Sequence, residues 1–199
     1  MSVHALQQKL SIQYEPATTA TDLQSLIGLY DEARSKLKNP NFLLPRNRND
    51  FQTMIAHGHL MVAWQHTHAD FYVPRGMVNV TIKSPDLNPR LLYGDQQGLS
   101  QALQSAAAAQ KAGEVCCLAV CPHYQRQGLA SALIDHTHQR MKAKNLTHAF
   151  SYAVIGNEPT LKLFTQQGYQ VVGTSKRVIT TSSGREQPGL QRWLLARTL

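Results

Sequence analysis

The feature that most constrains the fold is a segment in which an apolar strand passes through a glycine-containing loop directly into a helix. Residues 115–120 are nearly all apolar, Pro122 ends that run, and residues 128–144 have helical spacing. The first N–H groups of a helix lack partners within it, and the helix dipole is positive at that end. Gly128 and the small Ala130 let an anion approach the backbone. Such a junction can bind phosphate, although many α/β proteins contain one for structural reasons alone.

The spacing of apolar residues, either strand-like or helix-like, predicts the remaining strands and helices. Strand, helix, strand, helix and strand follow one another from residue 115, which indicates α/β packing. The segment 84–113 before them is unusually long for a hairpin connection and contains an Ala-rich helical stretch that Gly113 is expected to end. The expected strands are residues 11–15, 60–64, 76–82, 115–120, 149–155, 169–173, 177–181 and 191–196, and the expected helices are residues 22–37, 50–55, 99–112, 128–144 and 159–167.

Length and composition favour a folded globular protein. The chain has 199 residues and a mass of 22.2 kDa, with 42% hydrophobic and 16% charged residues, which suits a single domain over residues 1–199. No apolar run approaches the roughly 20 residues that a membrane helix needs, and the first residues lack the apolar centre of a secretory signal. We therefore expect a soluble cytoplasmic protein without a membrane partner.

The charge narrows the class of ligand. A net charge of +8 and a pI near 9.6 suit nucleic acid, an anionic membrane surface or an anionic cofactor. Lysine and arginine are spread along the chain rather than gathered in blocks, which argues against a dedicated nucleic-acid surface. A polyanionic cofactor remains compatible.

Cysteine and histidine spacing argues against a metal site. Cys116, Cys117 and Cys121 crowd one apolar strand without a CxxC pattern and are expected to be buried thiols. His57 with His59, and His66 with His68, are spaced two apart, but the sequence places no third ligand beside either pair. We expect no bound metal.

Two motifs carry a resemblance to a known family. The stretch 118–133 resembles the acyl-CoA-binding motif of the GNAT superfamily, R/Q-x-x-G-x-G/A, which Gln125, Gly128 and Ala130 match. Residues 157–169 resemble the second cofactor-side motif of that family, N-x-x-A-x-x-L-Y-x-x-x-G-F. Asn157 also suits a helix N-cap, as Gly168 suits a helix C-terminus. The resemblance covers roughly residues 114–173.

The resemblance implies an acetyl-CoA-dependent N-acetyltransferase with a mixed, mostly antiparallel sheet flanked by helices, and with residues 84–113 as a helical insert before the cofactor strand. By analogy, main-chain atoms of residues 118–120 pair with the pantetheine arm, amides of residues 126–131 hold the pyrophosphate, and Asn157 contacts the arm. The implied cofactor-binding residues are Leu118, Ala119, Val120, Gln125, Arg126, Gln127, Gly128, Leu129, Ala130, Ser131, Asn157 and Phe164.

The proton-transfer residues depart in part from the family pattern. An alkyl amine with a pKa near 10 must lose a proton before it attacks a thioester, and Glu114 resembles the catalytic glutamate of histone-acetylating members. Tyr152 stands where other members carry their glutamate base, and Phe164 stands where the family often has a tyrosine acid. An exposed strand-end carboxylate is the alternative for Glu114. Because Phe164 has no proton to give, water or another residue is expected to be the general acid. A thiol pKa near 8.5 makes the thiolate a tolerable leaving group without full protonation.

Alternatives remain open at this level. The acceptor is expected to be a primary amine of a small molecule or a protein, and the insert 84–113 either shapes the acceptor site or serves packing alone. A non-catalytic acyl-CoA-binding or sensing module is the alternative function. Nucleic-acid binding is a third hypothesis, and a homodimer is the assembly that we keep open.

Overall fold

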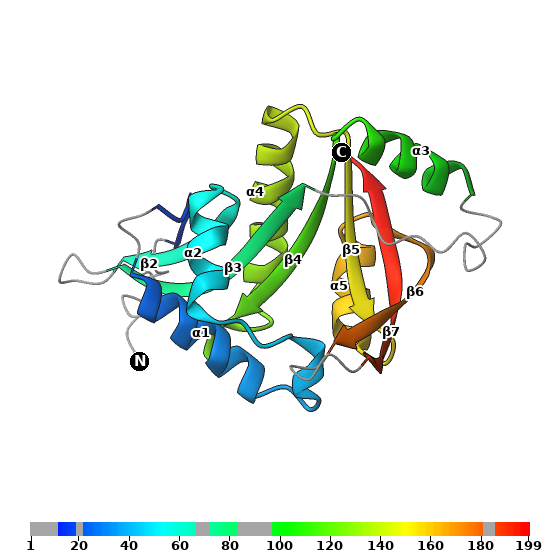
Figure 1. The fold of residues 1–199 in the computed structure, drawn as a ribbon. Coiled ribbons are helices and arrows are strands. Elements are labelled where there is room, and N and C mark those ends of the chain that lie inside the picture. The colour runs from blue at the N-terminus through cyan, green and yellow to red at the C-terminus, as the bar shows by residue number, and fades with distance from the viewer. Residues whose placement is uncertain (1–11, 19–21, 67–71, 83–96, 181–185) are drawn as a thin grey trace. The chain divides into compact units, whose positions relative to one another are not determined.

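The computed structural model describes residues 12–18, 22–66, 72–82, 97–180 and 186–199. Its strands form one seven-stranded sheet in the order β1-β2-β3-β4-β5-β7-β6 (Figure 1). Neighbours β1–β2, β2–β3, β5–β7 and β6–β7 are antiparallel, whereas β4 and β5 are parallel. The expected mixed, mostly antiparallel sheet with flanking helices is thereby confirmed. The elements are β1 (Ile12–Pro16), α1 (Leu23–Ser35), η2 (Pro40–Phe42), α2 (Arg48–Ala56), β2 (Leu60–His66), β3 (Tyr72–Ile82), α3 (Gln97–Ala108), β4 (Ala112–Val120), η5 (Pro122–Tyr124), α4 (Leu129–Ala143), β5 (His148–Val154), α5 (Glu158–Gln166), β6 (Gln170–Thr180) and β7 (Glu186–Thr198).

The chain divides into two compact units, which we call unit 1 and unit 2. Unit 1 comprises residues 1–79 and 117–136, and unit 2 comprises residues 80–116 and 137–199. The boundaries fall inside β3, β4 and α4 rather than in linkers. The organisation of residues 1–199 as one domain stays a prediction.

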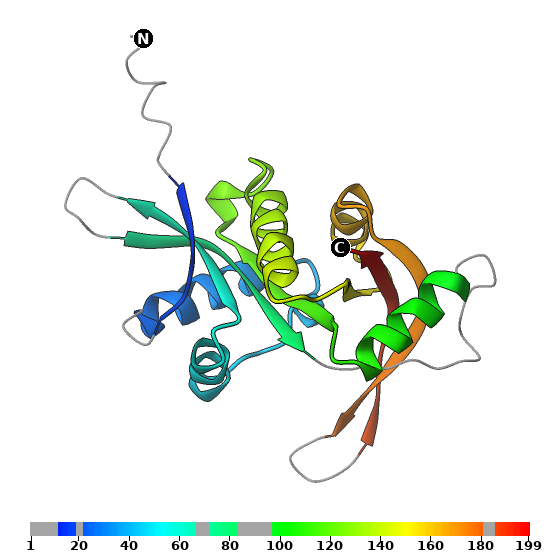
Figure 2. The same ribbon diagram turned by 90° about the horizontal axis from the view of Figure 1, so that it is seen from above.

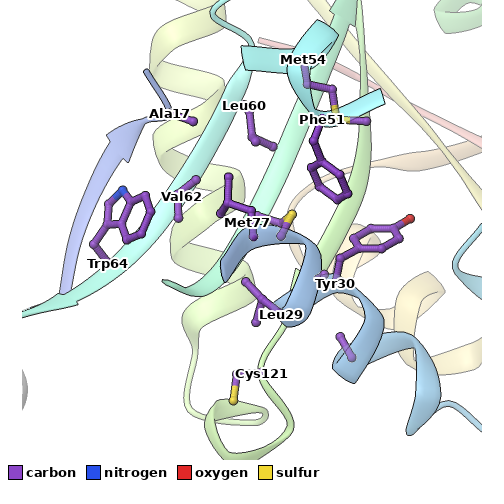
Figure 3. Close-up of a cluster of buried hydrophobic side chains, with 13 residues drawn as sticks. Ala17, Leu29, Tyr30, Phe51, Met54, Leu60, Val62, Trp64, Met77 and Cys121 are labelled. Carbon is purple, nitrogen blue, oxygen red and sulfur yellow. The ribbon is translucent and has the colours of Figure 1, made fainter. Parts of the chain in front are cut away.

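Unit 1 has an apolar core between α1, α2 and the strands β2, β3 and β4. Phe51, Leu26 and Met77 are fully buried there, and Tyr30 packs edge-on against Phe51 (Figure 3). The first half of α4 lies on the opposite face of these strands (Figure 2). A Cβ atom at Gly76 would come within 2.8 Å of Leu133 on that helix, so only glycine permits this close approach.

Local capping explains where the helices of unit 1 begin. Asp22 caps α1 as its side chain accepts a hydrogen bond from the Gln24 amide. The second helix, expected at residues 50–55, begins two residues earlier than predicted. Asn47 is the N-cap, and Asp50 is the N3 residue that completes a reciprocal capping box. The helix therefore begins at Arg48.

Unit 2 has its own core, in which α3 packs against β5, β6 and β7. Leu103 of α3 is fully buried with Phe150 and Val172. The prediction that Gly113 ends this helix is wrong, because the helix ends at Ala108 and Gln110 adopts the left-handed conformation with φ +56°. Gly113 lies inside β4, where a Cβ atom would meet Met141 at 2.8 Å and Val80 at 3.1 Å.

The C-terminal strands are longer than predicted. The two expected strands at residues 169–173 and 177–181 are one continuous strand, β6, and β7 begins at Glu186 instead of residue 191. Two register shifts, between Val171 and Gly173 and between Lys176 and Val178, interrupt the β6–β7 pairing without ending either strand. Residue 11 of the first expected strand, the first part of the insert (84–96) and residue 181 of the expected strand 177–181 lie outside the described residues.

Candidate active site

The turn that follows β4 is fixed by short-range hydrogen bonds within unit 1. The Tyr124 amide donates to the Cys121 carbonyl at 2.8 Å, and the Gln125 amide donates to the Pro122 carbonyl at 3.3 Å. The Gln125 side chain donates back to the carbonyl of Val120, the last residue of β4, at 3.2 Å. Gln125 therefore braces this loop, and its contact with the cofactor stays a prediction.

Backbone conformation, rather than side chains, gives the next residues an anion-binding geometry. Arg126 has φ +60° and Gly128 has φ +85°, and Gln127 between them has a negative φ. Alternating left- and right-handed residues turn successive N–H groups toward one concave face. Arg126, Gln127 and Gly128 are exposed, whereas Leu129 is buried and anchors the start of α4.

The amides of residues 126–131 are available to a ligand. Within the described part of the chain, residues 125–128 form a turn, and none of these N–H groups makes a hydrogen bond of regular geometry to a backbone or side-chain acceptor. Gly128 precedes the helix and has no side chain with which to cap it. The free N–H groups and the positive end of the helix dipole therefore coincide at the start of α4. His123 and Arg126 are exposed beside this turn, which we call the cofactor loop (residues 121–131).

The strand that leads into the cofactor loop has an irregular backbone. Cys117 has φ +54°, a left-handed conformation that a cysteine adopts only when the surrounding structure imposes it. In unit 1, Cys117 and Ala119 pack toward the core with α1 and α2, so Leu118 and Val120 face the other way. No sequence pattern predicted this irregularity. The three cysteines are free thiols, of which only Cys121 is fully buried, so the expectation of three buried thiols holds in part.

Glu114 lies in unit 2, at the last register pair between β4 and β5. It pairs with Phe150, and the described register of the two strands covers only Ala112 to Glu114. Ser151 then donates its hydroxyl to the Val115 carbonyl at 2.8 Å, in the place of a further ladder bond. Glu114 is 8% exposed, so it is a buried carboxylate and not the exposed strand-end residue considered as its alternative.

Asn157 and Phe164 also lie in unit 2, on the helix α5. Asn157 caps α5 through its side-chain oxygen, which accepts from the Thr160 amide at 3.4 Å. Gly168, with φ +78°, follows the helix end as predicted. Phe164 is 2% exposed and packs edge-on against Tyr169, with ring centroids 4.9 Å apart. Phe164 is therefore a core residue of unit 2.

A buried polar pair adjoins Phe164. His138 Nε2 and the Tyr169 hydroxyl are 2.8 Å apart. Burial, with smaller contributions from Arg197 and Lys142, lowers the pKa of His138 to about 4, so its ring is neutral at neutral pH. Burial also raises the pKa of Tyr169, against a smaller opposing effect of Arg197. Arg192 lies over the ring of Tyr152 at 4.0 Å, and Tyr152 packs against the core that contains α3.

Two further tests bear on ligands. Among the residues that the structure describes, no three histidine, cysteine, aspartate or glutamate side chains gather closely enough to hold a metal ion. In the same residues, no helix is long and apolar enough to cross a membrane.

Comparison with known proteins defines the class. The profile of the acetyltransferase (GNAT) family matches residues 39–169, which is more than half of the chain. A search of curated protein sequences found no match. The chain belongs to the GNAT acetyltransferase family. It is an acetyl-CoA-dependent N-acetyltransferase. Of the two functions considered from the sequence, the family therefore supports the enzyme and not the non-catalytic acyl-CoA-binding module.

Solved structures share the fold at low sequence identity. The ribosomal-protein-S18-alanine N-acetyltransferase from Escherichia coli is 14% identical, with a TM-score of 0.60 over 94% of this chain and 93% of that chain. NAA60 from Arabidopsis thaliana, in complex with acetyl-CoA, is 14% identical with a TM-score of 0.66, covering 95% of this chain and 99% of that chain. A phosphinothricin acetyltransferase from Sinorhizobium meliloti, in complex with AcCoA, is 16% identical with a TM-score of 0.63, covering 96% and 89%.

Proposed function

We propose that the cofactor loop binds the pyrophosphate of acetyl-CoA through the amides of residues 126–131. The observation that carries this proposal is the coincidence of alternating φ signs at Arg126, Gln127 and Gly128 with open amides at the start of a 15-residue helix. Main-chain groups of Leu118, Ala119 and Val120 pair with the pantetheine arm as a neighbouring strand does. Gln125 supports the loop rather than the ligand.

Asn157 and Phe164 of unit 2 are the other two residues that the family resemblance assigns to acetyl-CoA binding. Asn157 uses its side-chain oxygen as a helix cap, so its NH2 group is left to donate to a carbonyl of the pantetheine arm. Phe164 contributes apolar surface only, since its ring is buried and has no proton to give. The departing thiolate takes its proton from water or from the protonated base.

We propose that the acceptor is a primary amine, on a small molecule or a protein, and that Glu114 is the general base. The neutral amine nitrogen attacks the thioester carbonyl, the C–S bond breaks, and the surplus proton passes from the nitrogen to Glu114, directly or through water. Burial of this carboxylate supports the role, because a buried acid is held in one position and is poorly solvated. An N–H group of the β4 backbone stabilises the oxyanion.

The cofactor assignment is tested with a pair of glycine variants. Gly128→Glu places a side chain and a negative charge where φ is +85°, and we expect acetyl-CoA affinity, measured by calorimetry, to fall about 100-fold or more. Gly28→Glu is the matched control, because Gly28 is exposed on α1 with open space around it. Equal affinity of both variants and the wild type would show that the loop is not the cofactor site.

The acceptor class is tested by release of CoA thiol across a panel of amines. The panel contains small primary amines, amino acids and peptides with free N-termini or lysine side chains. Turnover with only one of these classes of amine identifies that class as the acceptor. Equal background rates with every amine, in a protein that binds acetyl-CoA, would contradict the primary-amine acceptor.

Cellular context and assembly stay predictions. We propose a cytoplasmic enzyme, since its cosubstrate acetyl-CoA is an intracellular metabolite and its cysteines are free thiols. The homodimer and the lack of nucleic-acid and membrane partners are tested by light scattering and by binding assays at low ionic strength.

A further inference from the structure

A side-chain network in unit 1 ties the first turn of the cofactor loop, residues 121–124, to β2 and β3. Gln65 of β2 is only 6% exposed. Its Oε1 atom accepts one hydrogen bond from Arg75 Nε at 2.6 Å and another from the Tyr124 hydroxyl at 2.7 Å. The Arg75 guanidinium also lies over the Tyr124 ring, 4.8 Å from its centroid. The Gln65 side-chain oxygen therefore joins β2, β3 and the turn at residues 121–124.

Arg75 reaches the turn because β3 has a bulge. The β2–β3 register passes from Ala63–Gly76 to Trp64–Pro74, so Arg75 is an extra residue without a partner in the ladder. A bulge redirects the side chain of the extra residue. The Arg75 carbonyl accepts the Cys121 amide at 2.9 Å, so both its backbone and its side chain contact the turn at 121–124.

The residues held by this network lead directly into the anion-binding backbone. Tyr124 lies two positions before Arg126, whose left-handed conformation costs about 1 kcal/mol for a residue with a side chain. Such a conformation persists only where neighbouring structure imposes it. On the far side of the loop, Leu129 and Leu133 anchor α4 against β3 at Gly76. On the near side, the Gln65 network is the corresponding anchor.

We infer that Gln65, acting through Tyr124 and Arg75, is a positioning residue that holds the cofactor loop in its phosphate-binding conformation. This inference rests on the proposal that the loop binds acetyl-CoA. Amides that already converge bind a phosphate without an ordering cost, whereas a loop released from its anchor pays that cost on binding. The network therefore affects the affinity for acetyl-CoA and does not affect the rate of acetyl transfer.

The test compares KM for acetyl-CoA with kcat in three variants. Gln65→Leu removes the shared acceptor, and Tyr124→Phe removes one of its donors. We expect both to raise KM for acetyl-CoA about 3- to 10-fold, the range for loss of one hydrogen bond, with kcat and the acceptor KM unchanged. Gln65→Glu keeps an oxygen in the same place and is expected to stay within about twofold of the wild type.

Tyr30→Phe is the matched control for a purely structural effect. Tyr30 lies in the same unit, and its hydroxyl donates to the Leu44 carbonyl at 2.8 Å. Its loss is expected to lower the unfolding temperature about as much as Tyr124→Phe does, without a change in KM for acetyl-CoA. An equal KM for the two phenylalanine variants, or failure of Gln65→Glu to restore KM, would overturn the inference.

Gly128→Glu belongs to the same panel, since it separates the two proposals. Unchanged acetyl-CoA affinity in Gly128→Glu shows that the loop is not the cofactor site. Lost affinity in Gly128→Glu with a normal KM in Tyr124→Phe contradicts the positioning role alone. If Gln65→Leu does not fold, Tyr124→Phe alone tests the positioning role, because it removes a single hydroxyl and is expected to fold.

Discussion

The cofactor loop of unit 1 and the Glu114 and α5 regions of unit 2 carry out their proposed roles with different parts of the chain. The loop presents backbone N–H groups, the side chains of Arg126 and Gln127 are exposed, and that of Gln125 braces the loop. Unit 2 relies on side chains, namely the buried Glu114 carboxylate, the buried Phe164 ring and the amide of Asn157. A backbone site tolerates changes of side chain and fails when φ changes. A side-chain site fails when a single atom is replaced.

The largest expected effect tests the side-chain half of this comparison. Glu114→Gln replaces one oxygen of the proposed base, and we expect kcat to fall about 100-fold or more with acetyl-CoA affinity unchanged. Steady-state kinetics and calorimetry measure the two quantities. Glu15→Gln, an exposed acid on β1, is the control. Wild-type kcat in Glu114→Gln would remove the catalytic role and leave a buried structural carboxylate.

The buried His138–Tyr169 pair predicts how stability depends on pH. The folded pKa of His138, about 4, lies below its ordinary value of 6.5. Protonation is therefore easier in the unfolded chain, and stability that is complete above pH 6.5 is lost as pH falls toward 4. The loss amounts to about 3 kcal/mol, which denaturant unfolding at pH 7 and pH 4.5 detects in large part. His138→Gln keeps a hydrogen-bond partner for Tyr169 without titrating, so its stability is expected to change less over this interval.

A smaller effect tests whether the cofactor loop binds acetyl-CoA through its backbone. Gly128→Ala adds a Cβ at φ +85° and no charge, and we expect about a 5- to 10-fold loss of acetyl-CoA affinity from backbone strain of about 1 kcal/mol. Arg126→Gly removes a charged side chain but accepts φ +60° without strain, and its affinity is expected to change less than about threefold. Isothermal calorimetry ranks the two. A larger effect of Arg126→Gly would mean that the loop binds through its side chain.

The smallest effect separates the two roles given to Asn157. Asn157→Ala removes the cap of α5 and is expected to cost about 1 kcal/mol of stability. Asn157→Asp retains the capping oxygen but lacks the NH2 group, so its stability should match the wild type while acetyl-CoA binds about threefold more weakly. Thermal unfolding and calorimetry on the same samples give both values. Unchanged binding in Asn157→Asp would reduce Asn157 to a cap.

The sequence predicted features that depend on neighbouring residues. Asn157 caps its helix, and Gly168 follows α5 in the left-handed conformation, as their positions indicated. Errors arose where two residues could perform the same local task. Asn47 caps α2 in place of Asp50, and Gln110 takes the left-handed position expected of Gly113. Glycine and asparagine preferences are too small to decide such cases against tertiary packing.

Long-range relations had no signal in the sequence. Gln65 is hydrogen-bonded to Arg75, 10 positions away, and to Tyr124, 59 positions away, and the Arg75 bond involves the extra residue of a bulge in β3 that no periodicity indicates. The left-handed Cys117 likewise lies in a strand that reads as regular. The insert helix α3 appeared equally suited to shape the acceptor site or to pack, and Leu103 proves to be part of the core of unit 2. Deleting that helix would therefore test folding before it tested the acceptor.

By itself, the sequence determined the order of the elements, the strand–loop–helix junction at residues 118–131 and the family to which the chain belongs. These are properties of short windows, in which apolar periodicity, glycine positions and motif spacing act through neighbouring residues. Only the tertiary structure decided that Glu114 is buried, that Phe164 is a core ring and that Gln65 and Arg75 brace the cofactor loop. Burial and hydrogen bonding between distant segments depend on how strands align, and strand alignment is fixed only when the whole sheet forms.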